Sequence, residues 1–141
     1  MADVLIVEDD FMDAELTVTA LHALPNPPRI HVVHDGQEAI DFLTSAIGQG
    51  ELALPKVIFL DLHLPHMSGL RALDAIKQNE ALRAIPVVML TSSNHESDIT
   101  SCYQTGANAY VVKPVDYLEF SQKVQKLGEF WVNTNRPPIA Q

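Results

Sequence analysis

The sequence predicts an α/β fold in which a five-stranded parallel sheet is covered by helices on both faces. Five short apolar runs alternate with five segments whose apolar residues recur at helical spacing, and this alternation is typical of parallel sheets. One run, residues 57–60, is apolar at every position, as expected of a strand buried on both faces. The chain of 141 residues is long enough for one domain with a substantial core.

The first half of the chain is predicted to contain three strands and two helices. Prolines at 25, 27 and 28 end the first helix, and an Asp35-Gly36 turn precedes the second. The first helix has its apolar side at Phe11, Ala14, Val18 and Leu21. In order, the segments are a strand at 4–7, a helix at 10–24, a strand at 30–33, a helix at 38–47, a loop at 48–55 and a strand at 57–60.

The second half continues the alternation. Ser68 is placed to cap a helix over 69–79, and Gly106 is placed to end a helix over 94–105. That second helix has Ile99, Cys102 and Tyr103 as its apolar anchors. Strands are predicted at 85–90 and 109–112, and Asp116 caps a last helix. The last helix covers the sheet with Tyr117, Phe120, Val124, Leu127 and Trp131.

Composition limits the function and the compartment. The net charge of −9 argues against direct binding to nucleic acid, which needs lysines and arginines to displace counterions. A single cysteine, Cys102, excludes an internal disulfide and suits a reducing cytoplasm. We find no signal peptide and no apolar run near the ~20 residues that span a bilayer, so we expect a cytoplasmic protein. We assign residues 1–132 to the domain and 133–141 to a tail that is flexible or ordered by a partner.

Polar residues follow four of the five predicted strands at the point where each strand ends. They are Glu8 and Asp9, Asp61, Thr91, and Lys113. Because the carboxyl ends of parallel strands meet at one edge of a sheet, we expect these side chains to converge at that edge, which we call the rim. Three crowded carboxylates need a cation among them. Their oxygen atoms suit Mg²⁺, with Mn²⁺ as a second choice.

These motifs resemble a response-regulator receiver domain. The matching elements are Val7 to Asp10, Asp35-Gly36, Asp61 with Pro65 and Gly69, Leu90-Thr91, Gly106-Ala107 and Tyr110 to Pro114. Each is weak alone, but all of them in order across residues 4–115 are specific. The resemblance implies a flavodoxin-like (βα)5 fold with strand order 2-1-3-4-5. It also implies that Asp61 accepts a phosphoryl group from a sensor histidine kinase.

A finer resemblance is to the stand-alone response regulators that accompany phytochrome histidine kinases. It rests on Asp13 after the acidic motif, the extended segment before residue 57, and a last helix that ends in Phe130-Trp131. It implies a phytochrome as the partner kinase. Phe130 and Trp131 lie beyond where the sheet needs cover, so with Tyr117 they indicate a homodimer; the alternative is that they pack back on the domain.

The resemblance also implies a role for each residue of the rim. Asp9 and Asp61 ligate the metal directly, Glu8 acts through water, and the main-chain carbonyl of His63 is the third protein oxygen. The phosphoryl group is bound by Lys113, the Thr91 hydroxyl and the backbone N–H of Ser92. Thr91 then moves inward and Tyr110 fills the space behind it. His63 and Ser93 occupy positions at which receivers tune dephosphorylation.

Each of these residues also has a plainer interpretation. Asp61 alone could cap a helix, Thr91 could merely end a strand, and Tyr110 could be fixed core. His63 and His66 invite a transition-metal site, but solvent-facing side chains are favoured, because no third soft ligand is evident.

Three functional classes remain open from the sequence. The first is a phospho-acceptor switch that is not an enzyme, although it phosphorylates itself from small phosphodonors and loses the group slowly. We expect it to stand alone, since the predicted domain leaves no residues for an output domain. The second is a phosphorylation-independent adaptor. The third is an aspartyl-phosphate hydrolase of the haloacid-dehalogenase type, which is disfavoured because His63 stands where those enzymes have a second aspartate.

Overall fold

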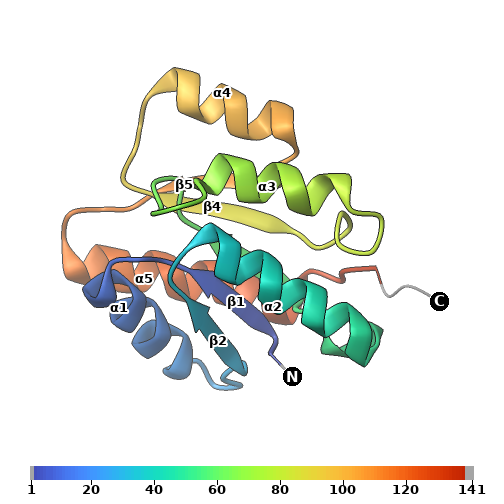
Figure 1. Cartoon of the computed structure of the whole chain (residues 1–141). Coiled ribbons are helices and arrows are strands. Elements are labelled where there is room, and N and C mark those ends of the chain that lie inside the picture. Colours follow the sequence, from blue (N-terminus) through green and yellow to red (C-terminus); the bar gives the residue numbers. More distant parts are fainter. Residues whose placement is uncertain (1, 139–141) are drawn as a thin grey trace.

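Five parallel strands form the centre of the molecule, and helices cover both faces of their sheet (Figure 1). The computed structural model describes residues 2–138. The strands run in the spatial order β2-β1-β3-β4-β5, so the predicted fold and strand order are confirmed. Their bounds are β1 Val4–Val7, β2 Ile30–Val33, β3 Val57–Leu60, β4 Val87–Thr91 and β5 Ala109–Val112.

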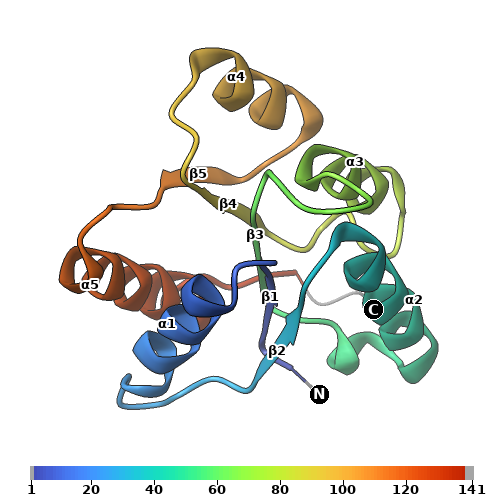
Figure 2. The ribbon, with the colours of Figure 1, turned by 60° about the vertical axis from the view of Figure 1, so that its left-hand side comes forward.

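Five α-helices connect these strands. Their bounds are α1 Phe11–His22, α2 Gly36–Gln49, α3 Gly69–Gln78, α4 Glu96–Thr105 and α5 Tyr117–Gly128. Helices α1 and α5 lie on one face of the sheet, and α2, α3 and α4 lie on the other (Figures 1 and 2). None of the helices in the described range has the length and apolar character that crossing a membrane requires.

Most helices begin at a polar side chain that caps the helix. Ser68 and Asp116 cap α3 and α5 as predicted, each accepting the N–H of the residue three positions later. Asp35 does the same for α2 through the N–H of Glu38. Helix α2 therefore starts at Gly36, and the separate Asp35-Gly36 turn that we expected is wrong. Gly106 ends α4 with a φ of 114°, as a left-handed cap requires.

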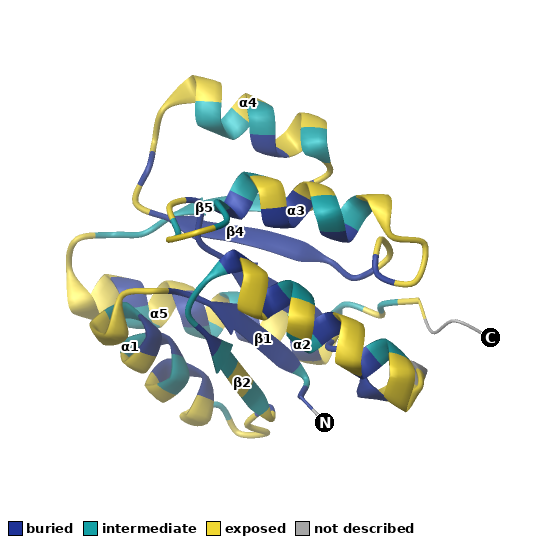
Figure 3. Ribbon diagram, in the orientation of Figure 1, coloured by how far each residue is buried: buried dark blue, intermediate teal, exposed yellow. Residues whose placement is uncertain are grey.

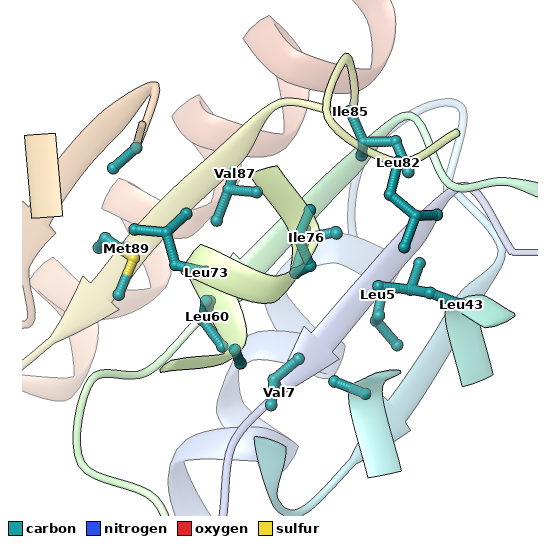
Figure 4. Close-up of a cluster of buried hydrophobic side chains, with 14 of the residues drawn as sticks. Leu5, Val7, Leu43, Leu60, Leu73, Ile76, Leu82, Ile85, Val87 and Met89 are labelled. Carbon is teal, nitrogen blue, oxygen red and sulfur yellow. The ribbon is translucent and has the colours of Figure 1, made fainter. Parts of the chain in front are cut away.

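Two clusters of buried side chains hold the layers together. One lies between the sheet and the α2, α3, α4 layer (Figure 4), and the other lies between the sheet and the α1, α5 layer. Strands β1, β3 and β4 are buried along their whole length, whereas β2 and β5 at the edges are partly exposed (Figure 3). The central strands are therefore the ones covered by helices on both faces, whereas the apolar run of β5 forms a partly exposed edge.

Three aromatic residues predicted on apolar helix faces are exposed instead. Phe11 is 74% exposed, Tyr117 60% and Tyr103 49%. Phe11 and Tyr117 are the first residues of α1 and α5, so they lie beyond the end of the sheet that their helices cover. Tyr103 belongs to α4, which stands beside the edge strand β5 and buries only Cys102. Helical spacing identified the faces correctly but could not show where the sheet stops beneath them.

The C-terminal end of α5 also differs from the prediction. A wider π-helical turn, Glu129–Thr134, continues the helix. This turn adds a residue and rotates the later side chains, so Val132 is buried at 7% exposure while Phe130 is 49% exposed. Trp131 is partly buried against the second cluster. The proposed tail at 133–141 is described as far as residue 138, and residues 139–141 lie outside the described range.

Gly69 holds the start of α3 directly against the strand end that carries Asp61. Its N–H donates to the Leu62 carbonyl at 2.8 Å. A Cβ atom at this position would lie 2.0 Å from the Asp61 carbonyl oxygen and 2.7 Å from the Leu62 Cα. Both obstructing atoms belong to the backbone, so a larger residue cannot be accommodated by a rotamer change.

We expect Gly69→Ala to lower the free energy of unfolding by about 3 kcal/mol, because overpacking against fixed backbone is costly. The matched control is Gly48→Ala in α2, where a new Cβ meets nothing within 4 Å. That control should raise stability by up to about 1 kcal/mol, since alanine is the better helix former. Urea denaturation of both variants measures the difference; equal stability of Gly69→Ala and the parent protein would contradict the close approach.

Candidate functional site

The ends of four strands bring the predicted polar residues to one rim. The Asp61 N–H donates to the Val7 carbonyl at 3.0 Å, and the Lys113 N–H donates to the Thr91 carbonyl at 2.8 Å. The sheet ladder thus continues one residue past β3 and one residue past β5, and it fixes the backbone from which the Asp61 and Lys113 side chains extend. The convergence that we expected from the sequence is present in the structure.

The Lys113 ammonium group is the centre of the rim. Its Nζ atom donates to Glu8 Oε1, to Asp13 Oδ2 at 2.9 Å and to Asp61 Oδ2 at 3.2 Å. The Lys113 side chain is only 7% exposed. One buried ammonium therefore holds three carboxylates that are far apart in the sequence.

Asp13 is the residue of this cluster whose contact the sequence did not predict. It lies in the first turn of α1, three residues after the capping residue Asp10. An acid at that place is usually explained by the helix dipole alone. The sequence could have predicted that Asp13 lies near the rim, because α1 begins at the rim and its first turn must lie over the strand ends. Asp10 itself caps α1 through the Asp13 N–H.

The electrostatics of the cluster show an excess of negative charge. Burial and the neighbouring Asp61 carboxylate raise the pKa of Glu8 to about 8. Burial alone would lower the pKa of Lys113, but its hydrogen bond to Glu8 and the charges of Asp61 and Glu8 together raise it. Lys113 therefore stays charged, and Glu8 readily holds a proton. A further cation at this place would have the same effect as the proton, because it would relieve the repulsion between the carboxylates.

Three carboxylates of the rim can hold a metal ion. Oxygen atoms of Glu8, Asp9 and Asp61 all lie within 4.8 Å of one another. Asp9 is exposed, so the group opens to solvent on one side. Oxygen donors around an opening fit a hard divalent cation that retains water. The residues present, together with the raised pKa of Glu8, fit the metal site expected from the sequence.

The remaining predicted residues surround this centre. Thr91 is fully buried, with its Oγ1 atom 3.4 Å from the Ser93 N–H, and Ser92 beside it is exposed. Tyr110 is half-buried on β5 and its hydroxyl donates to the Ser93 carbonyl at 2.9 Å. His63 follows Asp61 by two residues with an exposed side chain. The structure therefore gathers these residues at the rim, and their roles in binding a phosphoryl group stay predictions.

The histidines do not form a transition-metal site in the described part of the chain. His66 pairs through Nδ1 with Asp35 Oδ2 at 3.1 Å, and its side chain is 78% exposed. Within residues 2–138, the side chains that lie close enough together to bind a metal ion are the three carboxylates at the rim. Cys102 is fully buried in the core, as expected.

Known proteins share both the sequence and the fold. A family model described as the response regulator receiver domain matches residues 4–125. Two curated relatives match at similar identity. The probable methanogenesis regulatory protein FilR2 of Methanothrix harundinacea is 38% identical over 96% of this chain and 86% of its own. Response regulator Rcp1 of Synechocystis is 34% identical over 97% of this chain and 93% of its own.

Solved structures agree with these sequence matches. The phosphorylated cyanobacterial phytochrome response regulator RcpA superposes with a TM-score of 0.87 at 36% identity, over 96% of both chains. The Mn²⁺-bound form of Rcp1 gives 0.86 at 35% identity, over 96% of this chain and 97% of that one. The bacteriophytochrome response regulator RtBRR gives 0.72 at 45% identity, over 98% of this chain and 84% of that one.

The motifs, the strand order and the rim geometry thus agree with the family match over most of the chain. The chain belongs to the response regulator receiver domain family, whose members are signalling proteins, and it closely resembles the response regulators of phytochromes.

Proposed function

We propose that Asp61 accepts a phosphoryl group from the phosphohistidine of a partner kinase, and that this modification switches a protein-interaction surface. The observation that carries the proposal is the Asp61 carboxylate at a buried strand end, 3.2 Å from the Lys113 ammonium. A carboxylate oxygen attacks phosphorus, the P–N bond breaks, and its electron pair returns to the imidazole. Lys113 stabilises the charge, and the Thr91 hydroxyl and Ser92 N–H bind the phosphoryl oxygens.

A bound Mg²⁺ would supply charge neutralisation and orientation of the phosphoryl oxygens. Asp9 and Asp61 would hold it directly, Glu8 through water, and the main-chain carbonyl of His63 would complete the protein ligands. The clustering of the three carboxylates supports this assignment, as does the Mn²⁺-bound form of the relative Rcp1. Mn²⁺ is accordingly a second suitable ion.

The partner that we propose is a phytochrome histidine kinase, because relatives of this chain are named as phytochrome response regulators. A protein phosphodonor is also supported by exposed apolar side chains where α1 and α5 begin at the rim. They are Phe11, Met12, Val115, Tyr117 and Leu118. We place the transfer in the cytoplasm, where such a kinase obtains its phosphoryl group from ATP.

We also propose that the protein forms a homodimer through the end of its last helix. Phe130 is half-exposed and makes an edge-on contact with Trp131, at a centroid distance of 5.0 Å. Tyr117 stands at the other end of α5, where its hydroxyl contacts Met12 Sδ at 3.2 Å. An aromatic pair with one exposed ring, Phe130, resting on a partly buried one, Trp131, offers the kind of aromatic contact that is common at the centre of an interface.

Phosphorylation can be tested directly. With Mg²⁺ and acetyl phosphate, we expect one alkali-labile phosphoryl adduct per chain by mass spectrometry, and no adduct on Asp61→Asn. Asp74→Asn, at an exposed position of α3, is the control and should be labelled normally. Rapid multiple turnover would instead favour a hydrolase. Absence of any adduct from acetyl phosphate and from the kinase would favour the phosphorylation-independent adaptor.

Metal binding should depend on Asp9 and not on its neighbour Asp10. At ten times the dissociation constant, Mg²⁺ should raise the free energy of unfolding by about 1.4 kcal/mol. Asp9→Asn should lose this increment. Asp10→Asn should keep it, since asparagine caps a helix as well as aspartate does. Urea titrations with and without Mg²⁺ measure the increment, and an unchanged increment in Asp9→Asn would remove that residue from the site.

The dimer should weaken when the exposed aromatic side chain is truncated. Loss of a central contact of about 2 kcal/mol corresponds to a roughly 30-fold higher dissociation constant, so Phe130→Ala should shift the mass seen by light scattering towards the monomer. Leu52→Ala, an equally apolar exposed site 74% open to solvent, is the control. A dimer that persists unchanged in both Phe130→Ala and Trp131→Ala would place the interface elsewhere.

A further inference from the structure

Ser93 is a junction between three elements of the structure. It is buried, two residues beyond Thr91, and its hydroxyl donates to Asp98 Oδ2 at 2.5 Å. Its carbonyl accepts the Tyr110 hydroxyl from β5 at 2.9 Å, and its N–H lies 3.4 Å from the Thr91 Oγ1 atom. The end of β4, the first turn of α4 and the middle of β5 therefore meet at this residue.

The position of the N-terminus of α4 depends on the Ser93 junction, because α4 lacks the capping side chain with which the other helices begin. In the described chain, α1, α2, α3 and α5 each begin at a capping side chain that accepts a backbone N–H. The capping residue of α4, His95, makes no such bond. In its place, the Ser93 hydroxyl oxygen lies 3.4 Å from the His95 N–H while its proton goes to Asp98.

The rest of α4 gives little further anchorage. Cys102 is its single buried residue within the described structure, and Figure 3 shows the helix mostly exposed or partly exposed above β5. Elements with few buried contacts open at low free energy. A short hydrogen bond from a buried serine to the first turn is therefore a large part of what fixes the start of α4.

The direction of the Ser93 hydroxyl also limits its role at the phosphoryl site. A serine hydroxyl has one proton, and here that proton is given to Asp98. In this arrangement it does not donate to a water molecule or a phosphoryl oxygen at Asp61. The side chain at this position is turned towards α4 and away from the reacting atoms.

We propose that the Ser93–Asp98 hydrogen bond, which we call the latch, holds the first turn of α4 against the end of β4. We call this structural role the tie. We also propose that the latch transmits a displacement of Thr91 to α4. Ser93 and Asp98 are thus positioning residues. The transmission rests on the proposed phosphorylation of Asp61, whereas the tie itself does not. When Thr91 moves towards a phosphoryl group, Ser93 moves with it through the backbone, and the bond to Asp98 carries the movement to the first turn of the helix.

The tie is tested first in the unphosphorylated protein by amide hydrogen exchange. The Ile99 N–H donates to the His95 carbonyl at 3.1 Å in the first turn of α4. Loss of the latch in Ser93→Ala or Asp98→Ala should make this amide exchange about tenfold faster, as expected for the loss of one charge-assisted hydrogen bond. Asp98→Asn keeps an acceptor oxygen and should restore slow exchange. Ser97→Ala, an exposed site in the same turn, is the matched control.

The transmission is tested by repeating the measurement after treatment with acetyl phosphate and Mg²⁺. The parent protein and Asp98→Asn should show a change in α4 exchange on phosphorylation. Ser93→Ala should form the Asp61 adduct but lose that change. If the parent protein forms no adduct, the proposed function fails while the first measurement still decides the tie. Exchange in Ser93→Ala equal to that of the parent overturns the latch, even if the lifetime of the adduct differs.

Discussion

The structure of the rim depends on one buried ammonium group. Lys113 is nearly inaccessible to solvent and is tolerable there because Glu8, Asp13 and Asp61 accept its hydrogen bonds. The dependence is mutual, since three carboxylates this close could not all stay charged without a cation. The parallel sheet makes the arrangement possible, because it brings residues about one hundred positions apart to one edge and fixes their backbones through the strand ladder. Asp61, the proposed acceptor, is positioned by the same contacts that position its electrostatic partner Lys113.

Much of the fold and of the rim could be predicted from the sequence, because strands and the polar residues that follow them are recognised from short stretches of the chain. Short apolar runs indicated the strands, and polar residues after four of the five runs indicated the rim, so Asp61, Thr91 and Lys113 were found without long-range information. The contacts of Asp13 and Asp98 were not found, because they depend on how α1 and α4 are rotated over the sheet. Phe11 and Tyr117 were misplaced for a related reason: helical spacing defines a face but not the extent of the surface beneath it. The burial of Val132 follows from a π-helical turn that no pattern of residues indicated.

The two helical layers differ in how firmly they are held. On one face, Gly128 allows α5 to lie so close to α1 that a Cβ atom there would be 2.5 Å from Leu21 Cδ2. On the other face, α4 has a single buried residue and no side-chain cap of its own within the described chain. A rearrangement that starts at Thr91 therefore meets less resistance in α4 than in α5. If phosphorylation acts as we propose, this asymmetry would direct the response to the surface beside β5, where the Tyr110 hydroxyl contacts the loop that leads to α4.

The charge at the rim connects the metal site with the proposed phosphorylation. Three carboxylates, those of Glu8, Asp13 and Asp61, accept hydrogen bonds from the one ammonium group at the rim. A fourth, that of Asp9, lies near those of Glu8 and Asp61. The raised pKa of Glu8 indicates that the unmodified cluster already favours taking up a proton. Conversion of Asp61 to an acyl phosphate would add about one further negative charge at the same place. A proton on Glu8 compensates for one charge at most, whereas a divalent cation held, as we propose, by Asp9 and Asp61 would compensate for two and would leave Lys113 to bind the phosphoryl oxygens. On this reasoning the proposed phosphorylated state would require the cation, and the exposed Asp9 beside the buried Glu8 and Asp61 would be the carboxylate through which it enters from solvent.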